Sequence, residues 1–341
     1  MPGPRYESAL LIALAWTEED DNVPTRRWLA AGFVLTLIAP ALAQDVKPVK
    51  LEWKFEKDKT FYQTLTTDTS RTLKTTGTEV KQTNKETFVI GWTPLKQEDK
   101  NWVLKMRIEG LHVEGDFGGT KVAFDSTRDD NPPGPLTDGY KALVGAEFTL
   151  TLSPEMKAIR VEGGQTALQD FIKKAAAANP QTEKLLNQVL TEDALKAMAD
   201  ATFAAVPNKE VKKGDSWERT AVLALGPIGT FETKYTYTYD GPSDKDANVE
   251  KIGVKAEMTY KAPSDKLLAP FKVNSADLKS SEGAGTIEFR RDKGRVEKSE
   301  LKVTLKGKMN IDLGGNSDVD VTQTQTTTVT TSDENPIPKK K

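Results

Sequence analysis

The feature that most constrains this fold is a clear alternation of apolar and polar side chains near the C-terminal end. The apolar positions are Leu301, Val303, Leu305, Met309, Ile311 and Leu313. Successive side chains of a β-strand point to opposite faces, so this pattern predicts a strand with one buried and one solvated face. At about 3.3 Å per residue the strand is roughly 40 Å long, which favours a large, strongly curved antiparallel sheet.

Similar alternation recurs over most of the chain. We expect strands near 51–55, 60–75, 78–92, 101–113, 148–152, 159–161, 231–239, 252–260 and 319–329, and a short helix at 136–144. Threonine, lysine and glutamine occupy the polar faces, and we expect these faces to lie in water, as is common in antiparallel sheets.

A helical insert over residues 163–206 separates the two strand-rich regions. Helix starts are predicted at Thr166, which has capping-box spacing, at Asn179 before a proline, and at Thr191 before an acidic first turn. Each helix has one apolar face, which needs a partner. The apolar faces include Leu168, Phe171, Leu185, Leu186, Leu195 and Phe203.

The predicted fold class is therefore α+β, mainly β, with a large curved antiparallel sheet or sheets packed on a central helical insert. We expect residues 44–332 to form a single domain, because no Gly-, Pro- or Ser-rich linker separates the two strand-rich regions. Residues 333–341 are expected to form a polar tail.

Residues 1–43 are expected to be an upstream extension and a secretory signal peptide. Arg26 and Arg27 precede an apolar run over 28–38, and Ala41-Leu42-Ala43 fits a cleavage site. The run is shorter than the roughly 20 residues that span a bilayer, so stable membrane insertion after cleavage is not expected. We predict a periplasmic or extracellular protein; the Sec or twin-arginine route and a start at Met1 or Val23 stay open.

Charge and cysteine content exclude several function classes. Removing residues 1–43 takes three basic and five acidic residues from totals of 48 and 50, which leaves 45 of each. A formally neutral surface gives no field to hold nucleic acid. The chain has no cysteine, which excludes disulfides, thiol catalysis and an N-terminal lipidated cysteine.

Candidate catalytic and metal-binding residues are few. His112 is the sole histidine, and it alternates with apolar residues in a way that places it on the wet face of a strand. Two groups supply oxygen ligands, but each is better interpreted as a turn. The groups are Asp125, Asp129, Asp130 and Asn131, and Asp312, Asn316, Asp318 and Asp320 around Gly314-Gly315. We therefore predict no catalytic, cofactor-binding or metal residue and no cofactor.

An apolar cavity is the main open question. Six aromatic residues could line one, although such residues more often form the core. They are Trp53, Trp92, Trp102, Trp217, Tyr235 and Tyr237. The insert helices could likewise fill the concavity of the sheet or act as a lid over it, and their modest size favours filling.

Four phrases give the chain a family resemblance. They are Leu51-Glu52-Trp53-Lys54-Phe55, Phe124-Asp125-Ser126, the stretch 145–154, and Lys213-Gly214-Asp215-Ser216-Trp217. They resemble an uncharacterised family of exported bacterial proteins, known as a domain of unknown function. The resemblance implies export and a single architecture but no site. The expected fold is also loosely similar to open-barrel carriers of lipids or lipoproteins in the bacterial envelope.

These features favour an exported, non-enzymatic envelope protein that binds or carries an apolar ligand or a protein partner on the concave side of its sheet. Two alternatives come from other classes. One is a carboxylate-dependent hydrolase, and the other is a structural or assembly protein of the cell envelope.

Overall fold

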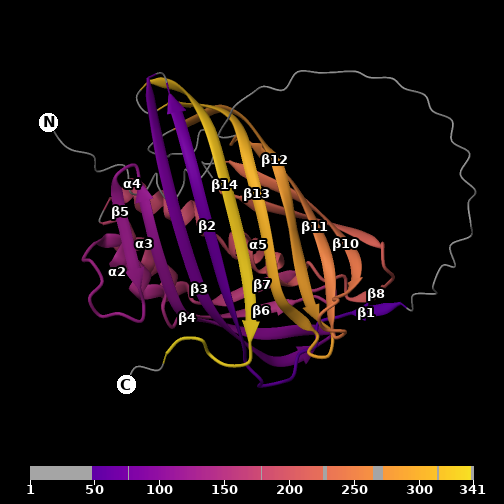
Figure 1. Ribbon diagram of the computed structural model, residues 1–341. Coiled ribbons are helices and arrows are strands. Elements are labelled where there is room, and N and C mark those ends of the chain that lie inside the picture. The colour runs from indigo at the N-terminus through magenta and orange to yellow at the C-terminus, as the bar shows by residue number, and fades with distance from the viewer. Residues whose placement is uncertain are drawn as a thin grey trace, which may run out of the picture.

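The computed structural model describes residues 48–75, 77–177, 179–225, 229–263, 272–312 and 315–338. The expected signal peptide and Leu313 lie outside the described residues. The predicted fold class is confirmed, because the structure is mainly β with a large antiparallel open sheet. Figure 1 shows the long strands side by side as a curved wall, with the helices on its inner side.

The strands of the large sheet are β2 (Phe61–Thr75), β3 (Thr78–Glu98), β4 (Asn101–Phe117), β5 (Thr120–Asp125), β6 (Glu147–Leu152), β7 (Ala158–Gly163), β9 (Ser216–Ala224), β10 (Thr230–Pro242), β11 (Val249–Lys261), β12 (Lys272–Arg290), β13 (Arg295–Asp312) and β14 (Asn316–Ser332). Their order is β7-β6-β4-β3-β2-β14-β13-β12-β11-β10-β9, and β5 pairs with β4. The short strands β1 (Val49–Leu51) and β8 (Lys209–Val211) pair separately.

Both strand-rich regions belong to this one sheet. They meet where β2 pairs with β14, from Tyr62 opposite Ser332 to Lys74 opposite Asp320. The sequence did not predict β12 as a strand. Its ladder with β13 shifts register between Val273 and Ser275 and again between Ser280 and Glu282, so the alternation of its side chains is interrupted.

The helices are α2 (Pro135–Leu143), α3 (Gln165–Ala175), α4 (Pro180–Val189) and α5 (Glu192–Phe203). Two predicted starts are confirmed, because Asn179 Oδ1 accepts from Gln181 N at 3.0 Å and Thr191 Oγ1 accepts from Ala194 N at 3.2 Å. The predicted start at Thr166 is wrong.

Gly164 caps α3 in place of Thr166. Its φ is 69°, in the left-handed region that glycine adopts readily, so the helix begins two residues before the capping-box spacing indicates. A Cβ at this position would lie 2.2 Å from the ring of Phe148, so a larger residue does not fit.

Helix α5 joins the two edges of the sheet. It packs against β7 at one edge and β9 at the other, and Phe203 lies in the main apolar cluster with side chains from both halves of the chain. The last carbonyls of a helix lack partners within it. Here they are capped from outside: Trp53 Nε1 donates to Phe203 O at 3.0 Å, Trp217 Nε1 to Ala205 O at 3.0 Å, and Arg219 Nε to Ala204 O at 3.2 Å.

The described part of the expected tail, residues 333–338, lies against the sheet. Arg295 Nη1 pairs with Asp333 Oδ1 at 2.7 Å, and Asn335 Nδ2 donates to Glu109 Oε2 at 3.2 Å. Ile337 lies so close to Gly110 that a Cβ on that glycine would be 2.4 Å from Ile337 Cδ1. The segment therefore contacts both β4 and β13.

We expect Phe203→Ala to lower the free energy of unfolding by about 3–5 kcal/mol, because the ring is 0% exposed and its loss leaves a cavity where the edges meet. Urea unfolding provides the measurement. Met198→Ala on the same helix is the control: its side chain is 59% exposed, and the expected change is below about 0.5 kcal/mol. Equal losses for both variants would contradict the role given to α5.

Candidate functional site

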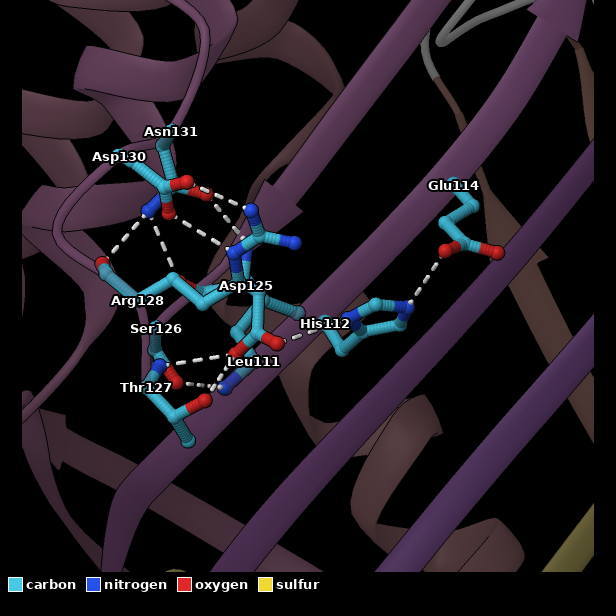
Figure 2. Close-up of polar contacts among 9 residues, drawn as sticks. All are labelled: Leu111, His112, Glu114, Asp125, Ser126, Thr127, Arg128, Asp130 and Asn131. Carbon is cyan, nitrogen blue, oxygen red and sulfur yellow. Dashed lines mark hydrogen bonds and ion pairs between the residues drawn. The ribbon is translucent and has the colours of Figure 1, made fainter.

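His112 lies on the outer face of β4, as predicted, between two carboxylates (Figure 2). Its Nδ1 is 3.6 Å from Asp125 Oδ2 and its Nε2 is 3.3 Å from Glu114 Oε1. The hydroxyls of Ser126 and Thr127 form hydrogen bonds with groups other than His112. Ser126 Oγ accepts from Leu111 N at 3.0 Å, and Thr127 Oγ1 donates to Asp125 Oδ1 at 2.7 Å. The arrangement is a surface His–carboxylate pair without a hydroxyl positioned on the imidazole.

The loop after Asp125 is held by its own side chains. Asn131 Oδ1 accepts from Asp125 N at 2.7 Å, while Asn131 Nδ2 donates to Arg128 O at 2.9 Å. Arg128 binds Asp130 through two hydrogen bonds of 2.8 and 2.7 Å (Figure 2). The structure places Asp125, Asp130 and Asn131 in turn-forming contacts, in agreement with the predicted turn. In the described ranges no group of three or more His, Asp or Glu side chains could hold a metal ion.

A pocket of about 560 Å³ lies at the far end of the sheet, lined by β2, β12, β13 and β14. Asp312 pairs with Asn316 there, so the predicted hairpin is confirmed, although Gly314 lies outside the described residues. Three aspartates line the pocket, and each has a partner. Asp277 pairs with Lys279 at 2.9 Å, Asp320 with Lys308 at 3.4 Å, and Asp318 Oδ1 accepts from Asn310 Nδ2 at 2.6 Å.

The six aromatic residues form core. Trp53, Trp92, Trp217 and Tyr237 are buried in the main apolar cluster, and Trp102 and Tyr235 pack against it. The rings of Trp53 and Trp92 lie 5.1 and 4.9 Å from that of Phe203, so α5 occupies the space between them.

A block of nine polar side chains lies on the inner face of the sheet, although such side chains were expected to face water. It consists of three rows across β14, β2 and β3, which we call the polar block. The rows are Gln323-Arg71-Gln82, Gln325-Thr69-Asn84 and Thr327-Thr67-Glu86. Residues opposite one another in a ladder point to the same face, and Arg71 shares its face with the core residue Phe61 at the other end of β2.

Apolar side chains flank the polar block on both sides. On β13, Leu305 and Val303 lie opposite its first two rows, and on β4, Val113 lies opposite Glu86. Helix α4 reaches both flanks, since Leu185 belongs to the cluster that contains Leu305 and Leu186 to the cluster that contains Val113. The helix therefore lies across the polar block.

Several buried polar atoms here have no hydrogen-bond partner. Within the described residues there are four such side-chain atoms, and three are Gln323 Nε2 and Asn84 Oδ1 in the polar block and Gln188 Oε1 on α4. The fourth, Glu250 Oε1, is compensated because it lies 3.1 Å from Arg291 Nη1 in an ion pair. Leaving a buried polar atom unpaired costs about 1–3 kcal/mol, so their concentration beneath one helix needs an explanation.

Arg71 is the basic member of the polar block, and only 4% of it is exposed. Its Nη1 donates to Gln82 Oε1 at 2.7 Å and its Nε to Gln323 Oε1 at 3.4 Å. Burial lowers the pKa of Arg71 to about 9, so the guanidinium keeps its charge at neutral pH. This site was not predicted from the sequence. The signal was present, because Arg71 stands in the same two-residue register as Phe61 and Leu73.

Comparison with known protein families gives one assignment. The family described as "Family of unknown function (DUF6263)" matches residues 99–335 of this chain. The chain belongs to this family. Membership confirms the resemblance to a domain of unknown function. Curated protein sequences give no match.

Solved structures resemble the DUF6263 protein loosely. A structure entitled "Lipid-protein interactions in lipovitellin" has a TM-score of 0.47 at 7% identity, covering 84% of this chain and 27% of that one. DynF from Micromonospora chersina has a TM-score of 0.20 at 9% identity, covering 87% and 92%. OccK8 (OprE) from Pseudomonas aeruginosa has 0.21 at 7%, covering 82% and 99%. Likeness at this level carries no functional argument.

A pH-dependent contribution to stability is expected from Asp125. Partial burial pushes its pKa upward, but hydrogen bonds from Thr127 and the nearby His112 outweigh this and hold the pKa of Asp125 below its ordinary value. A carboxyl with a lowered pKa stabilises the fold above its ordinary value of about 4, and the effect is lost as the pH falls through the lowered pKa.

We therefore expect Asp125→Asn to cost about 1 kcal/mol at pH 7, with the difference from the wild type shrinking toward pH 3 in urea unfolding. Glu114→Gln is the control, because that side chain is 64% exposed and should change stability by less than about 0.5 kcal/mol. A cost for Asp125→Asn that is the same at both pH values would show that ionisation of this carboxyl is not involved.

Proposed function

We propose that this protein is an exported, non-enzymatic binding or carrier protein that holds a partly apolar ligand on the inner face of its sheet, beneath α4. The observation that carries the proposal is the polar block with its unpaired atoms. A core evolved only for stability pairs its buried polar groups or replaces them with apolar ones, because the alternative is costly.

The surroundings of the polar block fit a ligand of mixed character. Ligand sites are mostly apolar, with a few polar groups that fix orientation. Here Leu305 and Val303 on one side and Val113 on the other supply the apolar walls. The polar block between them supplies amide, hydroxyl and guanidinium groups.

The four helices of the described residues are held to different degrees, which supports α4 as a cover. The C-terminal end of α5 is fixed by three side-chain donors and by β7 and β9. The backbone of α4 instead approaches that of α3, and α4 reaches the sheet through side chains such as Leu185 and Leu186. Elements with few backbone contacts open at lower free energy than the core. We infer that α4 gives access to the inner face.

Export is the second part of the proposal, and it rests on the basic, apolar and small-residue pattern of residues 1–43. No described helix is long and apolar enough to span a membrane. An envelope or extracellular location and the absence of stable membrane insertion after cleavage follow from this signal.

A carboxylate-dependent hydrolase is the less favoured alternative. It requires a pocket with an acid and a base, and the pocket at the far end of the sheet does contain Asp277, Asp318 and Asp320. Each of them, however, already binds a lysine or an asparagine. A structural or assembly role in the envelope would leave the unpaired atoms beneath α4 unexplained.

The carrier proposal predicts that the purified protein binds Nile red, a neutral apolar dye, or carries a co-purified apolar molecule in native mass spectrometry. Because the chain has no cysteine, Gln188→Cys introduces a sole thiol under α4. We expect a bound ligand to slow thiol modification of this variant several-fold. Met198→Cys, at an exposed position of α5, is the control and should react at one rate throughout.

The proposal fails if native mass spectrometry finds no bound molecule and Nile red does not bind. Dye binding that leaves the Gln188→Cys rate unchanged would place the ligand elsewhere and exclude α4 as the cover.

The export proposal predicts a mature protein that begins at Gln44, which N-terminal sequencing of the secreted or periplasmic fraction would detect. Replacing Arg26 and Arg27 by lysine distinguishes the two routes, because the twin-arginine route needs the arginine pair whereas an ordinary basic region does not. Full-length protein retained in the cytoplasm would overturn the proposal.

A further inference from the structure

Two buried charged residues, Glu250 and Arg71, differ in whether they have a counter-ion. Glu250 is 1% exposed, and its charge is compensated: Tyr239 Oη donates to Glu250 Oε2 at 2.5 Å, and Arg291 Nη1 lies 3.1 Å from Glu250 Oε1. Arg71 is buried to nearly the same degree, yet no ion pair of the described residues includes it. Burying an unpaired ion costs several kcal/mol, so a buried charge normally has a counter-ion.

The donors of Arg71 are also incompletely used. A guanidinium carries five N–H groups, and in the described part of the chain two of them have acceptors, the amide oxygens of Gln82 and Gln323. Gln323 presents a further donor, since its Nε2 is buried without a partner. Three N–H groups of Arg71 and the buried amide Nε2 of Gln323 therefore have no acceptor among the described residues.

The nearest carboxylate along the polar block does not fill this role. Glu86 lies two rows from Arg71 and accepts a hydrogen bond from Asn84 Nδ2 at 2.9 Å. The amide oxygens that do contact Arg71 are neutral, so they orient the guanidinium without cancelling its charge. The guanidinium is thus already oriented to bind an anion, because neutral acceptors hold it in place.

We propose that Arg71, oriented by Gln82 and assisted by Gln323 Nε2, binds the oxyanion group of an amphipathic ligand beneath α4. This inference rests on the carrier function proposed above and narrows its ligand to a molecule with an anionic end. Carboxylate and phosphate share the geometry that accepts two parallel N–H bonds from a guanidinium. The apolar part of the ligand lies against the adjoining flank formed by Leu185, Leu305 and Val321.

The proposal explains why the polar block is retained. Without ligand, the buried unpaired charge of Arg71 destabilises the fold. A bound anion would pair with this charge, whereas a neutral ligand would leave the guanidinium unpaired, so the site would bind the anion more tightly. An arginine needed only for packing would have its own counter-ion, as the mostly buried Arg295 does in Asp333, at 2.7 Å.

The test compares four probes that share a chain or a headgroup: dodecanoate, dodecyl phosphate, dodecanol and inorganic phosphate. Calorimetry or displacement of Nile red gives each affinity. We expect one or both dodecyl anions to bind the wild type about 10- to 100-fold more tightly than dodecanol, the range for a hydrogen bond to a charged group. Which dodecyl anion binds better identifies the headgroup, and inorganic phosphate should bind far more weakly.

Arg71→Met and Arg71→Gln should abolish this preference while dodecanol binding persists. Both variants remove a buried unpaired charge, so their thermal midpoints without ligand should equal or exceed that of the wild type. Arg295→Met is the control, because that arginine already has a counter-ion in Asp333 and its loss should leave the preference intact.

The outcomes separate the two proposals. Equal affinity for dodecanol and the dodecyl anions, or a preference that survives in both Arg71 variants, would overturn anion recognition while the carrier function stands. Failure of every dodecyl probe to bind would overturn both. Inorganic phosphate binding as tightly as dodecyl phosphate would overturn the requirement for an apolar chain.

Discussion

The structure depends on the hydrogen bonds that hold the C-terminal end of α5. A sheet that curls on itself but stays open has two edges, and its inner face is protected only if something holds these edges in place. Helix α5 does this at its C-terminal end, where the carbonyls of Phe203, Ala204 and Ala205 accept hydrogen bonds from Trp53, Trp217 and Arg219. These donors come from segments on both sides of the helical insert. The apolar residues around them exclude water, which strengthens each bond.

The attachment of α5 to both edges of the sheet determines which side chains of the inner face the other helices cover. With α5 fixed, the insert helices must lie over the sheet, and they cover polar as well as apolar side chains. The apolar flanks contribute stability, whereas Arg71, Gln323 and Asn84 reduce it through unpaired buried groups. A local violation of the rules that govern the rest of the core is what a functional site is expected to look like.

The sequence predicted those features that depend on local pattern. The strands followed from alternation at positions such as 301–312, and two helix starts followed from side-chain caps at Asn179 and Thr191. Features set by tertiary geometry were missed. Gly164 starts α3 because the chain leaves β7 in a left-handed turn, and the register shifts in β12 interrupt its alternation. The residues of the polar block share a face with apolar residues such as Phe61 and Leu73, but polar side chains were expected to lie in water, so the block was missed.

The pairing of β2 with β14 has a consequence for how the polar block comes into being. Arg71 and Gln323 touch across a sequence separation of 252 residues, so the partners meet only after almost the whole chain is available. Ladders between such distant segments form slowly, because the loop between them must close before the contacts repay its entropy. A nascent or truncated chain that ends before β14 can build the first half of the sheet, but it lacks one of the three strands that carry the polar block. The polar block is therefore complete only after β14, the last described strand, has paired with β2.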